Sequence, residues 1–85
     1  MQLDLYHLMG LALSEAKKGL LIGEVPVGAL VVTQEGKIVA KAHNQPISRN
    51  DPTAHAEILA LRKAGRSFLN YRLTNAILIT TIEPC

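Results

Sequence analysis

Hydrophobic and polar positions along the 85-residue chain form two helical patterns and three strand-like runs. In residues 3–20 apolar side chains recur at spacings of three and four, at Leu5, Met9, Ala12 and Ala16, as one face of an amphipathic helix requires. An acidic residue near the start and lysines near the end complement the helix dipole. This pattern predicts a helix over residues 3–20.

Two β-prone runs follow this helix. Residues 27–33 are apolar at nearly every position, which is typical of a strand covered on both faces. Gly28, inside the run, indicates that another part of the chain approaches the backbone closely there. Residues 38–42 predict a second strand after a short polar turn, so the pair is most simply an antiparallel hairpin.

A second helix is predicted after the polar loop of residues 43–50. Asp51 before Pro52 fits an N-cap and a first helical position, although Thr53 could equally serve as the cap. We expect this helix to end at Gly65. Four small or apolar residues recur at spacings of three and four and predict its packed side: Ala54, Ile58, Leu61 and Gly65.

Residues 76–82 are apolar at successive positions and predict a third strand, which would be central in a sheet. A central strand needs a neighbour on each edge and helices on both faces, yet only Glu83-Pro84-Cys85 follow it in this sequence. We therefore expect residues 1–85 to form a single, incomplete α/β domain.

Composition narrows the class of protein. With 48% hydrophobic and 19% charged residues the chain is globular rather than disordered. A net charge of +2 is too small to indicate a nucleic-acid partner by itself. One cysteine allows no internal disulfide, and there is neither a basic signal-peptide start nor an apolar run of about 18 residues. We expect a cytoplasmic protein that does not associate with membranes.

The first candidate for chemistry is the triplet His55-Ala56-Glu57, at the predicted start of the second helix. On a helix body the two polar side chains would point about 200° apart. They could serve one site only from the first turn, where both reach past the helix end. Taken alone, the triplet favours a simpler interpretation, a histidine in the capping region beside a solvated glutamate.

The second candidate is Cys85, which follows the third strand. A lone cysteine is usually a small buried hydrophobic residue. However, open α/β sheets place their sites beyond the carboxyl ends of strands, and His55 opens the helix that precedes this strand. Imidazole and thiolate are good zinc ligands, and Glu57 between them could move protons. A catalytic zinc normally takes three protein ligands, and the sequence supplies two obvious ones.

Five segments together resemble the N-terminal half of a tRNA adenosine deaminase, in the zinc-dependent cytidine-deaminase-like superfamily. The segments, which span nearly the whole chain, are Glu24-Val25-Pro26-Val27-Gly28-Ala29, His43-Asn44 with Pro46, Asp51-Pro52-Thr53-Ala54-His55-Ala56-Glu57, Asn70-Tyr71-Arg72-Leu73 and Glu83-Pro84-Cys85. The third is also similar to guanine deaminases, but the first and fourth favour the tRNA enzymes.

The resemblance implies a fold and a set of site residues. The fold would be a truncated cytidine-deaminase-like three-layer α/β/α sandwich, with the third strand beside the first. Zn²⁺ would be held by His55 and Cys85, and Glu57 would be the general acid/base. Three further residues are implied to contact the base or line its pocket: Asn44, Val27 and Ala54.

The implied function is hydrolytic deamination of the wobble adenosine of tRNA to inosine, with the anticodon stem-loop as partner and a homodimer as the usual assembly. Two alternatives remain open: a deaminase of small guanine or cytosine compounds, and a non-catalytic remnant that pairs with a partner subunit through its third strand. The family pattern places a second cysteine three positions after Cys85. We therefore expect this polypeptide alone to bind zinc weakly and not to deaminate.

Overall fold

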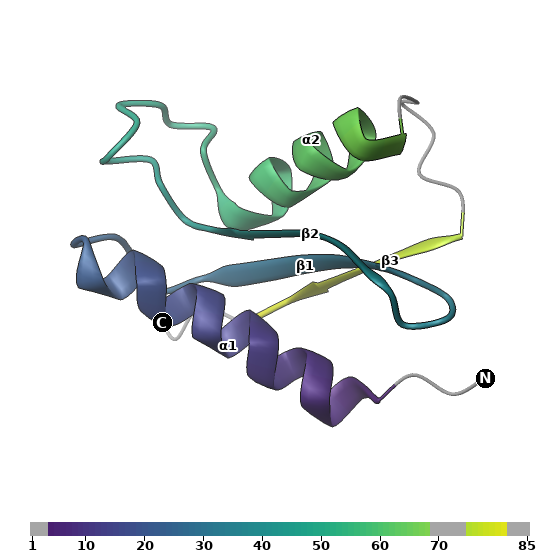
Figure 1. The fold of residues 1–85 in the computed structure, drawn as a ribbon. Coiled ribbons are helices and arrows are strands. Elements are labelled where there is room, and N and C mark those ends of the chain that lie inside the picture. Colours follow the sequence, from purple (N-terminus) through teal and green to yellow (C-terminus); the bar gives the residue numbers. More distant parts are fainter. Residues whose placement is uncertain (1–3, 69–74, 82–85) are drawn as a thin grey trace.

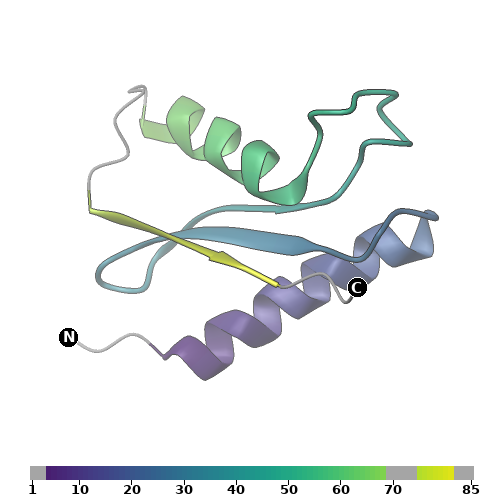
Figure 2. The same ribbon diagram turned by 180° about the vertical axis from the view of Figure 1, so that it is seen from behind.

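The computed structural model describes residues 4–68 and 75–81. Its elements, in chain order, are α1 (Leu5–Leu21), β1 (Gly28–Thr33), β2 (Ile38–His43), α2 (Ala56–Phe68) and β3 (Ala76–Thr80). The strands form one sheet, with α1 on one face and α2 on the other (Figure 1 and, from behind, Figure 2). The predicted three-layer α/β/α arrangement is therefore confirmed. Neither described helix is long and apolar enough to cross a membrane.

The strand order is β2-β1-β3, and β1 pairs antiparallel with both neighbours. The predicted hairpin and the placement of the third strand beside the first are confirmed. Among the described strands β1 is central and β3 pairs with β1 alone, so the outer edge of β3 is uncovered, as the sequence predicted for residues 1–85. Leu78, in the middle of β3, is 40% exposed.

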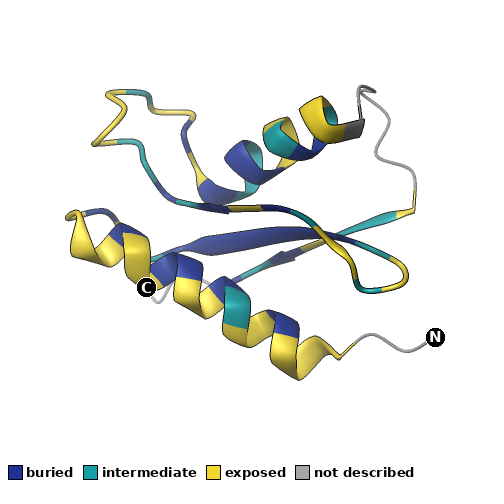
Figure 3. Cartoon of the chain, viewed as in Figure 1, coloured by how far each residue is buried: buried dark blue, intermediate teal, exposed yellow. Residues whose placement is uncertain are grey.

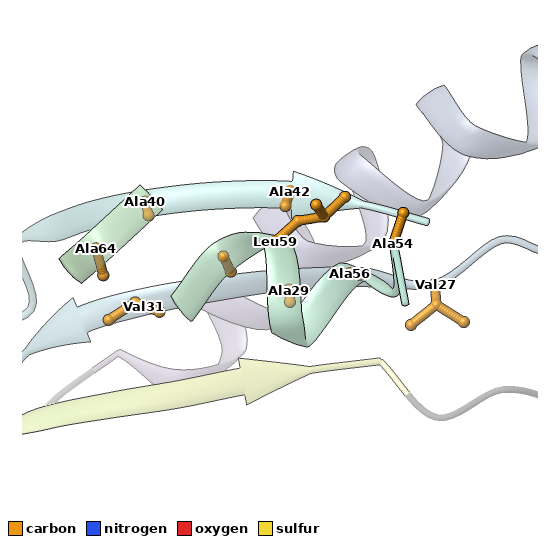
Figure 4. Packing of buried hydrophobic residues seen from close by; sticks show 10 residues of the cluster. Val27, Ala29, Val31, Ala40, Ala42, Ala54, Ala56, Leu59 and Ala64 are labelled. Atoms are coloured by element: carbon orange, nitrogen blue, oxygen red, sulfur yellow. The ribbon is translucent and has the colours of Figure 1, made fainter. Parts of the chain in front are cut away.

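The two faces of β1 contribute to two separate cores, which explains its unbroken apolar sequence. Ala29 and Val31 pack toward α2, while Leu30 and Val32 pack toward α1. Figure 3 shows β1 buried along its length between the two helices. The core on the α2 side is built mainly from alanine, as the close view of Figure 4 shows. Small side chains let the helix approach the sheet closely.

The packed face of α1 differs from the predicted one. Leu5 and Met9 are 60% and 38% exposed, and the helix instead buries Leu8 together with the predicted Ala12 and Ala16. Gly28 explains the rotation. A Cβ atom there would lie 1.9 Å from the carbonyl oxygen of Ala12, so the helix backbone rests directly on the strand. The close approach predicted at Gly28 is confirmed.

The start of α2 also differs, because the helix begins at Ala56 and not at Pro52. The Asp51 side chain makes a local turn instead of a helix cap. Its Oδ1 atom accepts hydrogen bonds from the backbone N–H of Thr53 (2.9 Å) and from the Thr53 hydroxyl (2.7 Å). Such turns compete with helix formation, which here starts three residues later than Thr53.

The packed side and the end of α2 were also predicted incorrectly. The helix continues through Gly65 to Phe68, since packing outweighs the cost of about 1 kcal/mol for glycine in a helix. Leu61 is 39% exposed, and Ile58 and Gly65 are half-buried. Ala54 is buried as predicted, in the segment before the helix. The helix residues that face the sheet are Ala56, Leu59, Ala60 and Ala64.

Candidate metal and base-binding site

The loop between β2 and α2 leaves and returns at one end of the sheet. At its start the N–H of Asn44 donates to the carbonyl oxygen of Val27 (3.0 Å). One residue later the N–H of Gln45 donates to the carbonyl oxygen of Ala54 (2.9 Å), which joins the two arms of the loop. The end of the loop, just before His55, is therefore hydrogen-bonded to the start of the loop, and the start of the loop is hydrogen-bonded to Val27, just before β1.

Asn44 fixes the first turn of α2. Its side chain is only 5% exposed, and its Oδ1 atom accepts a hydrogen bond of 2.7 Å from the N–H of Ala56. The first N–H groups of a helix have no partner within the helix, and Asn44 satisfies one of them from outside. His55 occupies the position just before the helix, and its carbonyl oxygen accepts the first helical bond, from Leu59 (2.9 Å).

The two side chains of the predicted chemistry lie at this helix start. The His55 residue is exposed and Glu57, in the first turn, is half-buried. His55 lies just before α2 and Glu57 in its first turn, so both stand at the helix start, and their service of one common site stays a prediction. An exposed imidazole is accessible to a metal ion, and a first-turn carboxylate lies where the positive end of the helix dipole favours negative charge.

The carboxyl end of β3 reaches the same end of the sheet. The N–H of Thr81 donates to the carbonyl oxygen of Gly28 (2.9 Å), and the N–H of Gly28 donates to the Thr81 hydroxyl (3.0 Å). Gly28 is in turn the sheet partner of His43, the last residue of β2. The carboxyl ends of β2 and β3 therefore lie at the same end of the sheet, on either side of Gly28.

Cys85 lies outside the described residues, as do Ile82, Glu83 and Pro84 and the segment Asn70-Tyr71-Arg72-Leu73. Within residues 4–68 and 75–81, no three His, Cys, Asp or Glu side chains are grouped as a metal site requires. The predicted ligand pair His55 and Cys85 is therefore still a prediction.

Val27 and Ala54 belong to one buried cluster, at the end where the loop meets the sheet (Figure 4). Val27 is 6% exposed and Ala54, which belongs to the loop itself, is fully buried, so both contribute to the core on the α2 side. Neither of two cavities among the described residues is lined by Val27 or Ala54. One of about 600 Å³ lies between α1, Pro26 and Thr81, and another of about 380 Å³ lies beside the β1–β2 turn.

Sequence reasoning missed Glu24 as a structural member of this region. Its side chain is 3% exposed and accepts hydrogen bonds from the backbone N–H groups of Ile47 (3.1 Å) and Ser48 (2.6 Å). Burial alone would raise the pKa of this carboxyl, but these hydrogen bonds and the nearby His43 outweigh burial and lower it. One sequence signal could have revealed this buried role: Glu24 is a lone charged residue between Gly23 and the apolar stretch that leads into β1.

Comparison with solved structures assigns the class of fold. A structure from a study of A-to-I editing by tRNA:A34 deaminases at the wobble position of transfer RNA has a TM-score of 0.88 and 41% identity, covering 96% of this chain and 62% of that one. A guanine deaminase from Bacillus subtilis has a TM-score of 0.80 and 40% identity, covering 91% of this chain and 49% of that one. The fold is thus cytidine-deaminase-like.

The family follows from the sequence as a whole. The model of the cytidine and deoxycytidylate deaminase zinc-binding region matches residues 3–85. The chain belongs to this family, whose metal is zinc.

Among curated relatives, the similar proteins are tRNA-specific adenosine deaminases. That of Haemophilus influenzae is 46% identical over 78 residues, which is 92% of this chain and 45% of the relative. That of Aquifex aeolicus is 47% identical over 79 residues, 93% of this chain and 52% of the relative. That of Buchnera aphidicola from Schizaphis graminum is 59% identical over 63 residues, 74% of this chain and 41% of the relative. The chain thus spans about half the length of these relatives.

Proposed function

We propose that this chain contributes to a zinc-dependent deaminase that converts the wobble adenosine of tRNA to inosine. The observation that carries the proposal is the placement of His55 and Glu57 at the start of α2, at the end of the sheet where β3 also finishes. The substrate class is supported by the relatives, which are tRNA-specific adenosine deaminases at 46–47% identity over more than nine tenths of the chain.

The proposed zinc ligands are His55 and Cys85. The donor set fits zinc, because imidazole nitrogen and thiolate sulfur are its preferred ligands, and the exposed position of His55 leaves its ring accessible. Thr81, the last described residue of the β3 segment, is four residues from Cys85 and lies at the same sheet end as the loop that carries His55. When bound, zinc supplies a Lewis acid that makes a water nucleophilic near neutral pH.

Glu57 is the proposed general acid/base. Its carboxylate would accept a proton from the attacking water and deliver it to N1 of the adenine; it would then take the second proton of that water from the added hydroxyl group and pass it to the departing amino group. Adenosine and water become inosine and ammonia in this reaction, so no oxidant or other co-reactant is needed. Glu57 lies in the first turn of α2, two residues after His55, which puts it at the same helix start as the proposed metal ligand.

The proposed base contacts use Asn44, Val27 and Ala54. Asn44 directs its Oδ1 atom to the Ala56 N–H, so the base would be read through the Nδ2 donor group of the same amide. Val27 and Ala54 are buried in one cluster at the end of the sheet where the loop begins and ends, and they would support the apolar wall of the base pocket. Ala54 is fully buried, so its role would be to set the depth of this wall.

The test is deamination by the full-length protein that carries this sequence, assayed together with its metal content. An anticodon stem-loop with adenosine at the wobble position should yield inosine, and a stem-loop with guanosine there should not react. Loss of zinc to a chelator should abolish the reaction. Failure of the zinc-loaded protein to produce inosine would contradict the proposal.

A second candidate, deamination of free guanine, is favoured by the 40% identity to the Bacillus subtilis enzyme at a TM-score of 0.80. The same assay with free guanine, adenosine and cytidine separates the two functions. Turnover of guanine without inosine in the stem-loop would favour this second candidate.

We also propose the tRNA anticodon stem-loop as partner, a homodimer as the assembly and the cytoplasm as location. Support for an RNA contact comes from Arg62 and Arg66, which are exposed on α2. Lys63 is half-buried, and its Nζ atom donates to the carbonyl oxygen of Lys41 (2.9 Å), which gives it a structural partner. Sizing of the full-length protein with and without RNA tests both the assembly and the partner.

A further inference from the structure

Glu24 is held at a fixed place by the end of α1. The helix ends at Leu21, and Gly23, the residue after its C-cap Ile22, has a φ angle of 81°, in the left-handed region. The N–H of Gly23 donates to the carbonyl oxygen of Leu20 (3.1 Å), and the N–H of Glu24 donates to that of Gly19 (3.0 Å). This pair of bonds is the Schellman ending of a helix. The backbone that carries the Glu24 carboxylate is therefore part of a rigid helix terminus.

The carboxylate reaches from this terminus into the loop between β2 and α2. Both of its oxygens are used, because Oε1 accepts from the N–H of Ile47 and Oε2 from that of Ser48. The segment is a single helical turn, in which the N–H of Arg49 donates to the carbonyl oxygen of Gln45 (3.0 Å). The first N–H groups of such a turn have no partner within it. Glu24 supplies the two acceptors that the turn lacks.

The turn is connected to His55 by two further hydrogen bonds. The N–H of Asp51 donates to the carbonyl oxygen of Pro46 (2.9 Å) and closes the turn. The bond from the N–H of Gln45 to the carbonyl oxygen of Ala54 then joins it to the arm that ends at His55. Displacement of the turn would therefore be transmitted to the residue just before α2.

We propose that Glu24 is a positioning residue, which holds the loop between β2 and α2 so that His55 and Asn44 stand in place for the metal and the base. The inference rests on the proposed function, because only there do these two residues have their roles. Glu24 also begins the short connector to Val27, so its side chain ties this connector to the loop that carries Asn44 and His55.

Glu15 provides a matched comparison. It is a second buried carboxylate, 5% exposed, and its Oε2 atom pairs with Nζ of Lys18 (2.6 Å) on the same helix. None of its described hydrogen bonds reaches the loop. Glu15→Gln therefore makes the same chemical change at nearly the same burial without touching the proposed path to His55.

The experiment compares Glu24→Gln and Glu15→Gln in the full-length protein. Readouts are amide hydrogen exchange at Ile47 and Ser48, the imidazole NMR signal of His55, and kcat and KM for the stem-loop. Glu24→Gln should speed exchange at both amides, shift the His55 signal and lower kcat/KM roughly 10- to 100-fold, as expected for a residue that orients a metal ligand. Glu15→Gln should leave the His55 signal and kcat/KM unchanged, even where it lowers Tm.

The inference would be overturned if Glu24→Gln speeds exchange at Ile47 and Ser48 while the His55 signal stays at its parental position. The positioning role of Glu24 can be tested even if the protein shows no deaminase activity. If the parent protein deaminates no substrate, the proposed function fails, but a His55 shift in Glu24→Gln and not in Glu15→Gln still supports positioning. Should Glu24→Gln fail to fold, Glu24→Asp keeps the charge and withdraws the oxygens by one methylene, and the same comparison applies to it.

Discussion

The side-chain oxygen of Asn44 accepts a hydrogen bond of 2.7 Å from the backbone N–H of Ala56, across an interval of 12 residues. This contact links the end of β2 to the first turn of α2 and brings the proposed base contact next to the proposed metal ligand His55. One side-chain amide thus has two separate tasks, since Oδ1 holds the helix and Nδ2 would read the base.

Two substitutions at Asn44 separate these tasks. Asn44→Ala leaves the buried N–H of Ala56 without its acceptor and should lower the free energy of unfolding by roughly 1–3 kcal/mol. Asn44→Asp keeps an acceptor and adds negative charge at a helix N-terminus, so stability should be retained. It lacks the Nδ2 donor, however, and should raise KM for the stem-loop. Denaturant unfolding and steady-state kinetics check the two effects, and equal destabilisation by both substitutions would contradict this division.

Substitutions at His55 and Glu57 should affect metal and chemistry differently. Glu57→Gln removes the proton carrier, so kcat should fall roughly 10²- to 10⁴-fold while zinc content is retained. His55→Ala removes a proposed ligand and should lower zinc content and activity together. Metal analysis beside kcat distinguishes the two results. His7→Ala, at an exposed histidine of α1, is the control and should change neither. Full zinc content in His55→Ala would show that the ligand assignment is wrong.

Gly28→Ala should be among the most damaging small substitutions in the chain. The added Cβ atom would lie 1.9 Å from the carbonyl oxygen of Ala12 and 2.7 Å from the nitrogen of Ala16, so the helix backbone would have to move. We expect a loss of about 3 kcal/mol in the free energy of unfolding, the upper end of the usual range for overpacking.

Gly10→Ala is the control for this experiment, since an added Cβ at Gly10 meets nothing within 4 Å. It lies inside α1, so alanine there should stabilise the protein by roughly 0.5–1 kcal/mol. Thermal or denaturant unfolding of both variants gives the comparison. Equal stability of Gly28→Ala and the parent would mean that α1 does not rest on β1 as described.

The lowered pKa of Glu24 predicts a pH dependence of stability. Burial alone would raise this pKa, but the hydrogen bonds from Ser48 and Ile47 and the nearby His43 lower it from the usual 4.5. A carboxyl with a lower pKa in the folded state stabilises the fold above its unfolded pKa, and that contribution is lost as the pH falls through the folded pKa.

In the Glu24→Gln variant this contribution is missing at every pH. The free energy of unfolding should therefore fall less steeply in the variant than in the parent as the pH drops below about 4.5, the region where an ordinary carboxyl titrates. Urea unfolding at a series of pH values measures both slopes. Parallel curves in the acid range would contradict the assignment of a lowered pKa to Glu24.

The sequence was sufficient for the order of elements and for the end of the sheet at which the site lies. Apolar periodicity and turn residues are local signals, and they correctly predicted α1, the hairpin and the third strand. The details that failed depend on contacts distant in sequence. The face of α1 depends on Gly28, and the start of α2 depends on both the Asp51 turn and the Asn44 side chain. Local helix propensity cannot show that the Asp51 turn and the Asn44 hydrogen bond outweigh the preference of Pro52 for a first helical position.

The candidate site was predicted at His55 and Glu57 from the resemblance to the deaminase family, because the triplet alone favours a capping histidine beside a solvated glutamate. Glu24 was missed because its partners are two backbone N–H groups more than twenty residues away, which carry no sequence signature. Burial of Ala54 was predicted, but its place in the core on the α2 side was visible only from the packing of Val27 and Ala54 in one cluster.

The division of β1 between two unlike cores also protects the fold from mispairing. Ala29 faces the alanine-lined helix α2, while the larger Leu30 and Val32 face α1. A shift of β1 by one residue would exchange these faces. It would force leucine into the space that Ala29 fills and leave a void beneath α1, so each misregistered sheet would carry both a clash and a cavity. The small side chains beneath α2 therefore select the register of the sheet as well as filling its core.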